Sequence, residues 1–253
     1  MVKIIGVTQA RVGSTRLPEK ILKTVNGASL LSIHLNRILQ SKQITKLIVA
    51  TTNEEGVDLI LSICKECNVD YYQGSLNDVL DRFYQTVLPE NPDWVVRLTS
   101  DCPLIDANVI DDIIQSAILN NFDYTSNTLN PTYPDGIDVE VFKFSALQKA
   151  FNEAKLSSER EHVTSYIWKN SDFKGGTLFK AFSYENETDF SSIRLTVDTI
   201  EDFEVIEKLI QIEGTKKDWL TYVNTLNKHP EIKIINQKYF RNEGYDKSIN
   251  SEK

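Results

Sequence analysis

The chain has 253 residues, 41% of them hydrophobic and 25% charged, with a formal net charge of −8 and a pI near 5.0. This length suits one α/β domain with a sizeable core, no apolar stretch approaches the ~20 residues of a membrane span, and the acidic balance argues against a nucleic-acid partner. Three cysteines and no recognisable secretory signal predict a cytoplasmic protein that does not bind a membrane.

Apolar runs alternate with stretches of helical periodicity over the first 120 residues. Strands are expected at 3–8, 46–51, 69–72 and 94–99, with helices between them and a strong helix over 107–119. This alternation predicts right-handed βαβ units and a mostly parallel sheet flanked by helices. Since ligands of such sheets lie outside the carboxyl ends of the strands, the loops 9–20 and 100–106 are the expected site.

The pattern changes after about residue 121. We interpret 1–235 as one domain with an inserted lobe at about 123–185, followed by a polar tail over 236–253 that is expected to fray. In this second half, strands are expected at 137–142, 176–182 and 193–197, and helices at 145–154, 161–169, 200–212 and 218–226.

The loop over 9–20 combines one glycine, two hydroxyl side chains and three cations. Glycine permits a backbone geometry that other residues resist, exposed amides and hydroxyls can donate to phosphate oxygens, and the cations can neutralise a polyphosphate. The Walker A spacing is absent, and a solvated loop with scattered charges is the alternative. The expected nucleotide contacts are Gln9, Ala10, Arg11, Gly13, Ser14, Thr15, Arg16 and Lys20.

Two aspartates follow predicted strands at the same edge of the sheet. Asp101 comes just after 94–99, and Asp198 follows 193–197. Either one alone could be a turn or helix-cap residue, as we expect for Asp106. Together, facing a cationic loop, they predict a shared Mg²⁺ that bridges phosphate oxygens.

Five ordered segments resemble the SpsF-type (spore coat polysaccharide biosynthesis) branch of the sugar-acid cytidylyltransferases, whose relatives include the CMP-KDO and CMP-acylneuraminate synthetases. The segments are 10–20 (Ala-Arg-x-Gly-Ser-Thr-Arg-Leu-Pro-x-Lys), 97–106, 133–142, 159–164 and 197–199, and the resemblance runs over about residues 3–213. It implies a Rossmann-like fold, Mg²⁺ dependence, transfer of CMP from CTP with release of pyrophosphate, and usually a homodimer.

Site residues carry over at the matching positions. The resemblance implies triphosphate contacts from Arg11, Ser14, Arg16 and Lys20, metal ligation by Asp101 and Asp198, and a nucleotide pocket that includes Gly74, Ser75, Asp78 and Thr99. The chain departs from the KDO synthetases at 99–103, where they have Gln-Gly-Asp-Glu-Pro, and from the acylneuraminate synthetases at 14–17. The resemblance therefore does not identify the acceptor.

Acceptor-side candidates lie in the inserted lobe. They are Asp135, Asp138, Glu140, Arg160 and His162. Asp138 and Glu140 are two apart, so on a strand they would share one face, which could meet the acceptor, a metal or solvent. His162 could contact a substrate anion, or it could be an ordinary half-buried histidine. The acceptor itself could be a keto-sugar acid, an amino-sugar acid, a polyol phosphate or a phosphonate.

The expected reaction is in-line attack of an acceptor oxygen on the α-phosphate of CTP. Arg11, Lys20, Asp101 and Asp198 would act by positioning and charge stabilisation. Three alternatives stay open at this point: a nucleotidyltransferase with another base, a glycosyltransferase that consumes a nucleotide sugar, and a non-catalytic nucleotide-binding regulator. The glycosyltransferase would usually need an Asp-x-Asp metal pair, and the close acid pairs of this chain fit other roles.

Overall fold

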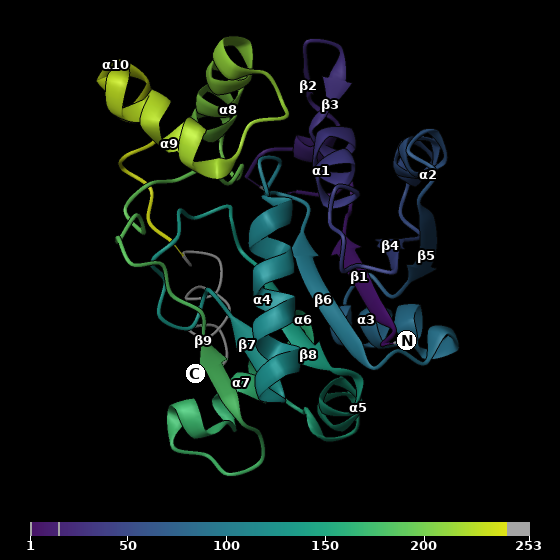
Figure 1. Ribbon diagram of the computed structural model, residues 1–253. Coiled ribbons are helices and arrows are strands. Elements are labelled where there is room, and N and C mark those ends of the chain that lie inside the picture. Colours follow the sequence, from purple (N-terminus) through teal and green to yellow (C-terminus); the bar gives the residue numbers. More distant parts are fainter. Residues whose placement is uncertain (1, 15, 242–253) are drawn as a thin grey trace.

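The computed structural model describes residues 2–14 and 16–241, and within them the fold is built on a seven-stranded sheet (Figure 1). In spatial order its strands are β5 (Asp70–Gly74), β4 (Lys46–Thr52), β1 (Ile4–Gln9), β6 (Trp94–Thr99), β8 (Glu140–Lys143), β7 (Tyr124–Ser126) and β9 (Ala181–Ser183). Strand β8 is antiparallel to both neighbours, and the other adjacent pairs are parallel. The predicted mostly parallel α/β sheet is confirmed.

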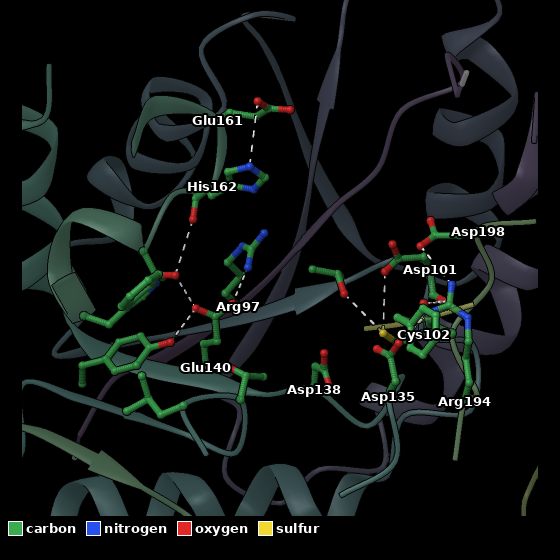
Figure 2. A pocket seen from close by; sticks show the side chains of 18 of the residues that line it. Arg97, Asp101, Cys102, Asp135, Asp138, Glu140, Glu161, His162, Arg194 and Asp198 are labelled. Carbon is green, nitrogen blue, oxygen red and sulfur yellow. Dashed lines mark hydrogen bonds and ion pairs between the residues drawn. The ribbon is translucent and has the colours of Figure 1, made fainter. Parts of the chain in front are cut away.

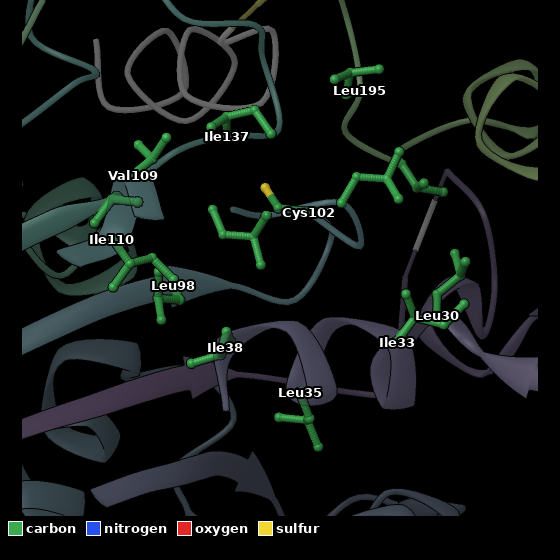
Figure 3. Close-up of a cluster of buried hydrophobic side chains, with 14 of the residues drawn as sticks. Leu30, Ile33, Leu35, Ile38, Leu98, Cys102, Val109, Ile110, Ile137 and Leu195 are labelled. Carbon is green, nitrogen blue, oxygen red and sulfur yellow. The ribbon is translucent and has the colours of Figure 1, made fainter. Parts of the chain in front are cut away.

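Helices cover both faces of the sheet because successive residues of its central strands point into two different cores. In β6, Val95 packs into one core and Val96 into the other. The core on the Val96 side involves α1 (Leu30–Ile38), α2 (Val57–Glu66), α4 (Ala107–Asn120), α8 (Ile200–Glu213) and α9 (Trp219–Lys228). The Val95 side involves α3 (Val79–Val87), α5 (Phe144–Glu153) and α7 (Ser165–Lys169). Figure 3 shows Leu98 of β6 in the first core with Ile38 of α1 and Ile110 of α4.

Short elements and caps complete the described chain. They are β2 (Thr24–Val25), β3 (Ala28–Ser29), α6 (Ser157–Glu161), α10 (Pro230–Lys233), and the 3-10 turns η1 (Lys20–Leu22), η2 (Leu88–Glu90) and η3 (Asp172–Lys174). Asp106 accepts hydrogen bonds from the amides of Asn108 and Val109, which confirms it as the N-cap of α4. None of the helices in the described ranges is long and apolar enough to cross a membrane.

The second half differs from the predicted elements in several places. Of the helix expected over 161–169, only α7 forms, because Val163 adopts a left-handed conformation with φ of 51° and separates α7 from α6, which ends at Glu161. Of the strand expected over 176–182, only Ala181–Ser183 forms a strand. The strand expected over 193–197 is an extended segment that forms an isolated bridge between Arg194 and Asp135. Strand β7 was not predicted. In the tail, Asn236 is buried, while residues 242–253 lie outside the described part of the chain.

Candidate active site

Two adjoining cavities lie at the carboxyl ends of β1 and β6, where the strand order of the sheet reverses. The first, here called the loop cavity, is lined by the loop 9–20 and has a volume of about 540 Å³. The second, the insert cavity, is lined largely by residues 124–174 and also has about 540 Å³. The cavities share a wall that includes Arg16, Arg97, Thr99, Asp101, His162 and Asp198. A ligand in one cavity would therefore meet a ligand in the other at this wall.

The loop cavity contains most of the residues predicted for the nucleotide. Gln9, Ala10, Arg11, Gly13, Ser14, Arg16 and Lys20 line it, whereas Thr15 lies outside the described residues. The Gly13 amide donates to Oε1 of Glu54 at 2.7 Å, and the Thr52 hydroxyl donates to Oε2 of the same carboxylate at 2.6 Å. The Glu54 carboxylate, just after β4, thus accepts a hydrogen bond from an amide that could otherwise donate to a phosphate oxygen.

The two predicted metal ligands converge on one cation of the loop. Nζ of Lys20 lies 3.2 Å from Oδ2 of Asp101 and 2.8 Å from Oδ1 of Asp198. Arg16 also reaches Oδ1 of Asp198, at 2.8 Å. Burial acts to raise the pKa of Asp101, but Lys20 beside it and a hydrogen bond from Thr99 hold that pKa well below its usual range. Asp101 is therefore ionised at neutral pH, with Lys20 as its counterion.

Arg194 joins Asp198 to the wall of the insert cavity (Figure 2). Its guanidinium binds Asp202 through Nε at 2.8 Å, Asp135 through NH1 at 2.6 Å, and Oδ2 of Asp198 through NH2 at 3.3 Å. Asp202 is fully buried and also accepts from the amides of Asp198 and Thr199. This arrangement leaves Oδ1 of Asp198 facing the loop cations.

Arg97 projects from β6 into the wall that both cavities share. It donates to Gln9 through Nε at 3.1 Å and pairs with Glu140 of β8. Glu140 also accepts from the hydroxyls of Tyr124 and Thr164, so its carboxylate is held on three sides. Glu140 lines the insert cavity, and its contacts make it a support for Arg97.

Asp135 and Asp138 face the insert cavity close to Asp101. Burial and the neighbouring Asp138 raise the pKa of Asp135, while Arg194 and Arg241 oppose the shift. Burial also raises the pKa of Asp138, which pairs with Arg241. These acids favour their protonated forms more than free aspartates do, which suits hydrogen bonding to a polar ligand.

Several predicted residues lie elsewhere. Arg160 binds Asp78 with both Nε and NH2, at 2.9 and 2.6 Å to Oδ2, and thereby ties α6 to the N-cap of α3. Neither residue lines the two cavities, and neither do Gly74 and Ser75; their neighbours Leu76, Asn77 and Val79 line the loop cavity instead. His162, by contrast, does lie in the shared wall, and its Nε2 is 3.9 Å from Glu161.

The charged residues of the site that the sequence reasoning missed include Arg97, Arg194 and Glu54. Arg97 and Arg194 each interrupt an apolar run, and a charge in such a run needs a buried partner. That signal was present in the sequence, although it does not name the partner. Glu54 stands in a polar loop and carried no comparable signal.

The donor set fits a metal that arrives with phosphate. Mg²⁺ is usually held by one or two carboxylates together with substrate phosphates and water, and Asp101 and Asp198 supply two carboxylates directed at one point. Among the described residues there is no group of three or more His, Cys, Asp or Glu side chains that could hold a metal without a ligand. Asp101 and Asp198 are therefore the residues that would hold it.

A cationic loop at a strand-order reversal, facing two carboxylates, defines an α/β nucleotidyltransferase. A cytidylyltransferase family model matches residues 5–229, and the chain belongs to that family. It is 33% identical to the spore coat polysaccharide biosynthesis protein SpsF of Bacillus subtilis, over 90% of this chain and 95% of the relative. It is 40% identical to an uncharacterized protein of Methanocaldococcus jannaschii, over 94% and 98% of the two chains. The structure of a cytidylyltransferase from Leptospira borgpetersenii superposes with a TM-score of 0.88 at 34% identity, covering 95% of this chain and all of that one.

These comparisons confirm the predicted SpsF-type cytidylyltransferase family. The chain is an enzyme that uses CTP, and the alternatives of another nucleotide base and of a glycosyltransferase are set aside.

Proposed function

We propose that the enzyme transfers CMP from CTP to a small anionic or sugar-like acceptor, in a Mg²⁺-dependent reaction that releases pyrophosphate. The observation that carries the proposal is the wall shared by the two cavities. CTP in the loop cavity and an acceptor in the insert cavity would meet at Asp101 and Asp198. Two reactants held in line across such a wall need little more than positioning and charge stabilisation.

Each part of the site has a role in this reaction. Arg11, Arg16, Lys20 and the Gly13 amide would bind the triphosphate and stabilise the charge that develops on the departing pyrophosphate. Asp101 and Asp198 would hold the metal, which would supply charge neutralisation to the phosphates. Arg97, fixed by Glu140, would position the reacting groups at the shared wall.

The inserted lobe supplies the acceptor side of the proposal. Asp135, Asp138 and His162 line the insert cavity and can hydrogen-bond to an acceptor. Arg160 and Glu140 are proposed to act indirectly, through α6 and Arg97 respectively. The homodimer implied by the resemblance and the cytoplasmic location predicted from composition stay predictions.

The test measures pyrophosphate release from CTP and Mg²⁺ across a panel of sugar acids, polyol phosphates and phosphonates. With the acceptor that supports turnover, Asp101→Asn and Asp198→Asn should each reduce kcat/KM by about a hundredfold or more, because each removes charge from the metal site. Asp58→Asn, an exposed change on α2, is the matched control and should behave as the wild type. Near-normal Mg²⁺-dependent turnover by Asp101→Asn would reject the metal assignment.

A further inference from the structure

Lys20 occupies the place where a cation would bridge the two predicted metal ligands. Its ammonium contacts one oxygen of Asp101 and one of Asp198, at 3.2 and 2.8 Å, and its side chain is 16% exposed. Lysine is protonated at neutral pH unless its surroundings strongly oppose the charge, and two carboxylates at ion-pair distance favour the charged form. The group between the carboxylates is therefore a charged ammonium.

On the loop side of this point the charges balance without a nucleotide. Asp101 and Asp198 supply two negative charges, and Lys20 and Arg16 supply two positive charges within ion-pair distance. Arg194, on the other side of Asp198, is also paired with Asp135 and Asp202. A divalent ion bound to both carboxylates would lie a few ångströms from the ammonium, where repulsion in a partly desolvated site is strong. The carboxylates are thus poor metal ligands while Lys20 stays in place.

Lys20 also belongs to the loop that is proposed to bind the triphosphate. It lies at the first position of η1, after Glu19, which has a left-handed backbone with φ of 55°. Its side chain lines the loop cavity, and lysine has a long flexible stem and a compact charge. A triphosphate in that cavity would offer the ammonium a stronger set of anionic partners.

We propose that Lys20 is an internal substitute for the metal, which keeps Mg²⁺ off Asp101 and Asp198 until a triphosphate draws the ammonium away. This inference rests on the proposed function and adds an order of binding to it: the metal enters with the nucleotide and not before it. Because coupling between two ligands is reciprocal, the nucleotide raises metal affinity at these carboxylates by the factor with which the metal raises nucleotide affinity.

The test uses the full-length protein without nucleotide and measures Mn²⁺ binding from the electron paramagnetic resonance signal of free Mn²⁺. Lys20→Met should bind Mn²⁺ at least about tenfold more tightly than the wild type, because the competing charge is gone. The double variant Lys20→Met/Asp198→Asn should lose that gain, which assigns it to this site. Lys23→Met is the matched control, since the Lys23 ammonium faces the Phe203 ring at 5.5 Å.

Two further variants keep the test decisive if Lys20→Met folds poorly. Lys20→Gln removes the charge and keeps a hydrogen-bond donor, so it should also bind Mn²⁺ more tightly, whereas Lys20→Arg keeps the charge and should not. Mn²⁺ alone should then raise the Tm of Lys20→Gln but not that of the wild type. Folded Lys20→Met or Lys20→Gln protein with wild-type Mn²⁺ affinity would overturn the inference. Pyrophosphate release by the wild type is a separate measurement, so failure of the proposed function would be recognised independently.

Discussion

The polar groups of the loop 9–20 and those around Arg194 are held in different ways. In the loop, the Arg16 side chain is 36% exposed, and its contact is a carboxylate that a phosphate can replace. Around Arg194, the arginine side chain is 8% exposed and the Asp202 side chain is fully buried. The active site therefore joins a region whose ionic partners can be exchanged to a region whose partners are fixed.

The difference in burial between the two regions suits the proposed reaction. Partly exposed ion pairs contribute little stability and can be broken cheaply, so a ligand can displace them. A buried charge that loses its partner is costly, so the fixed region keeps Asp198 and the insert cavity in one geometry. Each of the following predictions tests on which side of this division a residue lies.

The largest effect is expected from Arg194→Met. The change leaves Asp202 and Asp135 buried without their shared counterion, which should lower the free energy of unfolding by about 3–5 kcal/mol. Urea denaturation followed by circular dichroism measures it. Arg16→Met is the comparison from the exchangeable region, and it should lower stability by no more than about 1 kcal/mol while weakening CTP binding. Equal losses of stability in the two variants would remove the distinction.

A second prediction concerns His34, which is fully buried beneath the site. Its Nε2 lies 2.7 Å from Oγ1 of Thr8, its Nδ1 lies 2.8 Å from the Cys102 carbonyl oxygen, and burial lowers its pKa to about 4. The unfolded chain takes up a proton near pH 6.5 and the native protein does not, so stability present at neutral pH is lost as the pH falls from 6.5 toward 4. The full loss is about 3 kcal/mol.

Unfolding curves between pH 7 and 4.5 measure this effect. The free energy of unfolding of His34→Gln should depend less on pH than that of the wild type, because the titrating group is absent. His229→Gln changes an exposed histidine and should keep the wild-type slope. If the free energy of unfolding of His34→Gln depended on pH as steeply as that of the wild type, His34 would not belong to the fixed region.

The sequence predicts the two regions unequally well. Strands β1, β4 and β6 appear in the sequence as apolar runs. Because ligands of parallel sheets lie at the carboxyl ends of the strands, the sequence also places Asp101 near the loop. Lys20 and Asp198 are 178 positions apart. Their contact depends on the packing of the extended segment before Asp198 against the loop after β6, which periodicity does not show. The buried strand Tyr124–Ser126 is too short to give a pattern. Charges within apolar runs indicate that Arg97 and Arg194 need partners, but Glu140, Asp135 and Asp202 become those partners through tertiary packing alone.

The smallest predicted effect lies at Glu54, at the boundary between the regions. Its carboxylate accepts a hydrogen bond from the Gly13 amide, as an anion in the loop cavity would. Its negative charge also acts to raise the pKa of Arg82, whereas the neighbouring Arg11 acts to lower that pKa. If the contact is exchangeable, the carboxylate competes with phosphate for the loop. Glu54→Gln keeps the acceptor oxygen and removes the charge, so the Kd for CTP should fall about two- to fivefold, with the free energy of unfolding changed by less than about 0.5 kcal/mol.

Isothermal titration with CTP measures that affinity, and Glu55→Gln, a change at the exposed neighbouring residue, is the matched control. Weaker CTP binding together with lower stability would place Glu54 in the fixed region, because its charge would then be holding the loop in its binding conformation. If Glu54→Gln binds CTP more tightly at unchanged stability, Glu54 occupies a phosphate position in the free loop. Glu54 would then act together with Asp101 and Asp198, which contact the loop cations where the nucleotide and its metal would bind. The loop would then be held close to its bound shape by the protein's own carboxylates, and the cost of that arrangement would be a few-fold in CTP affinity.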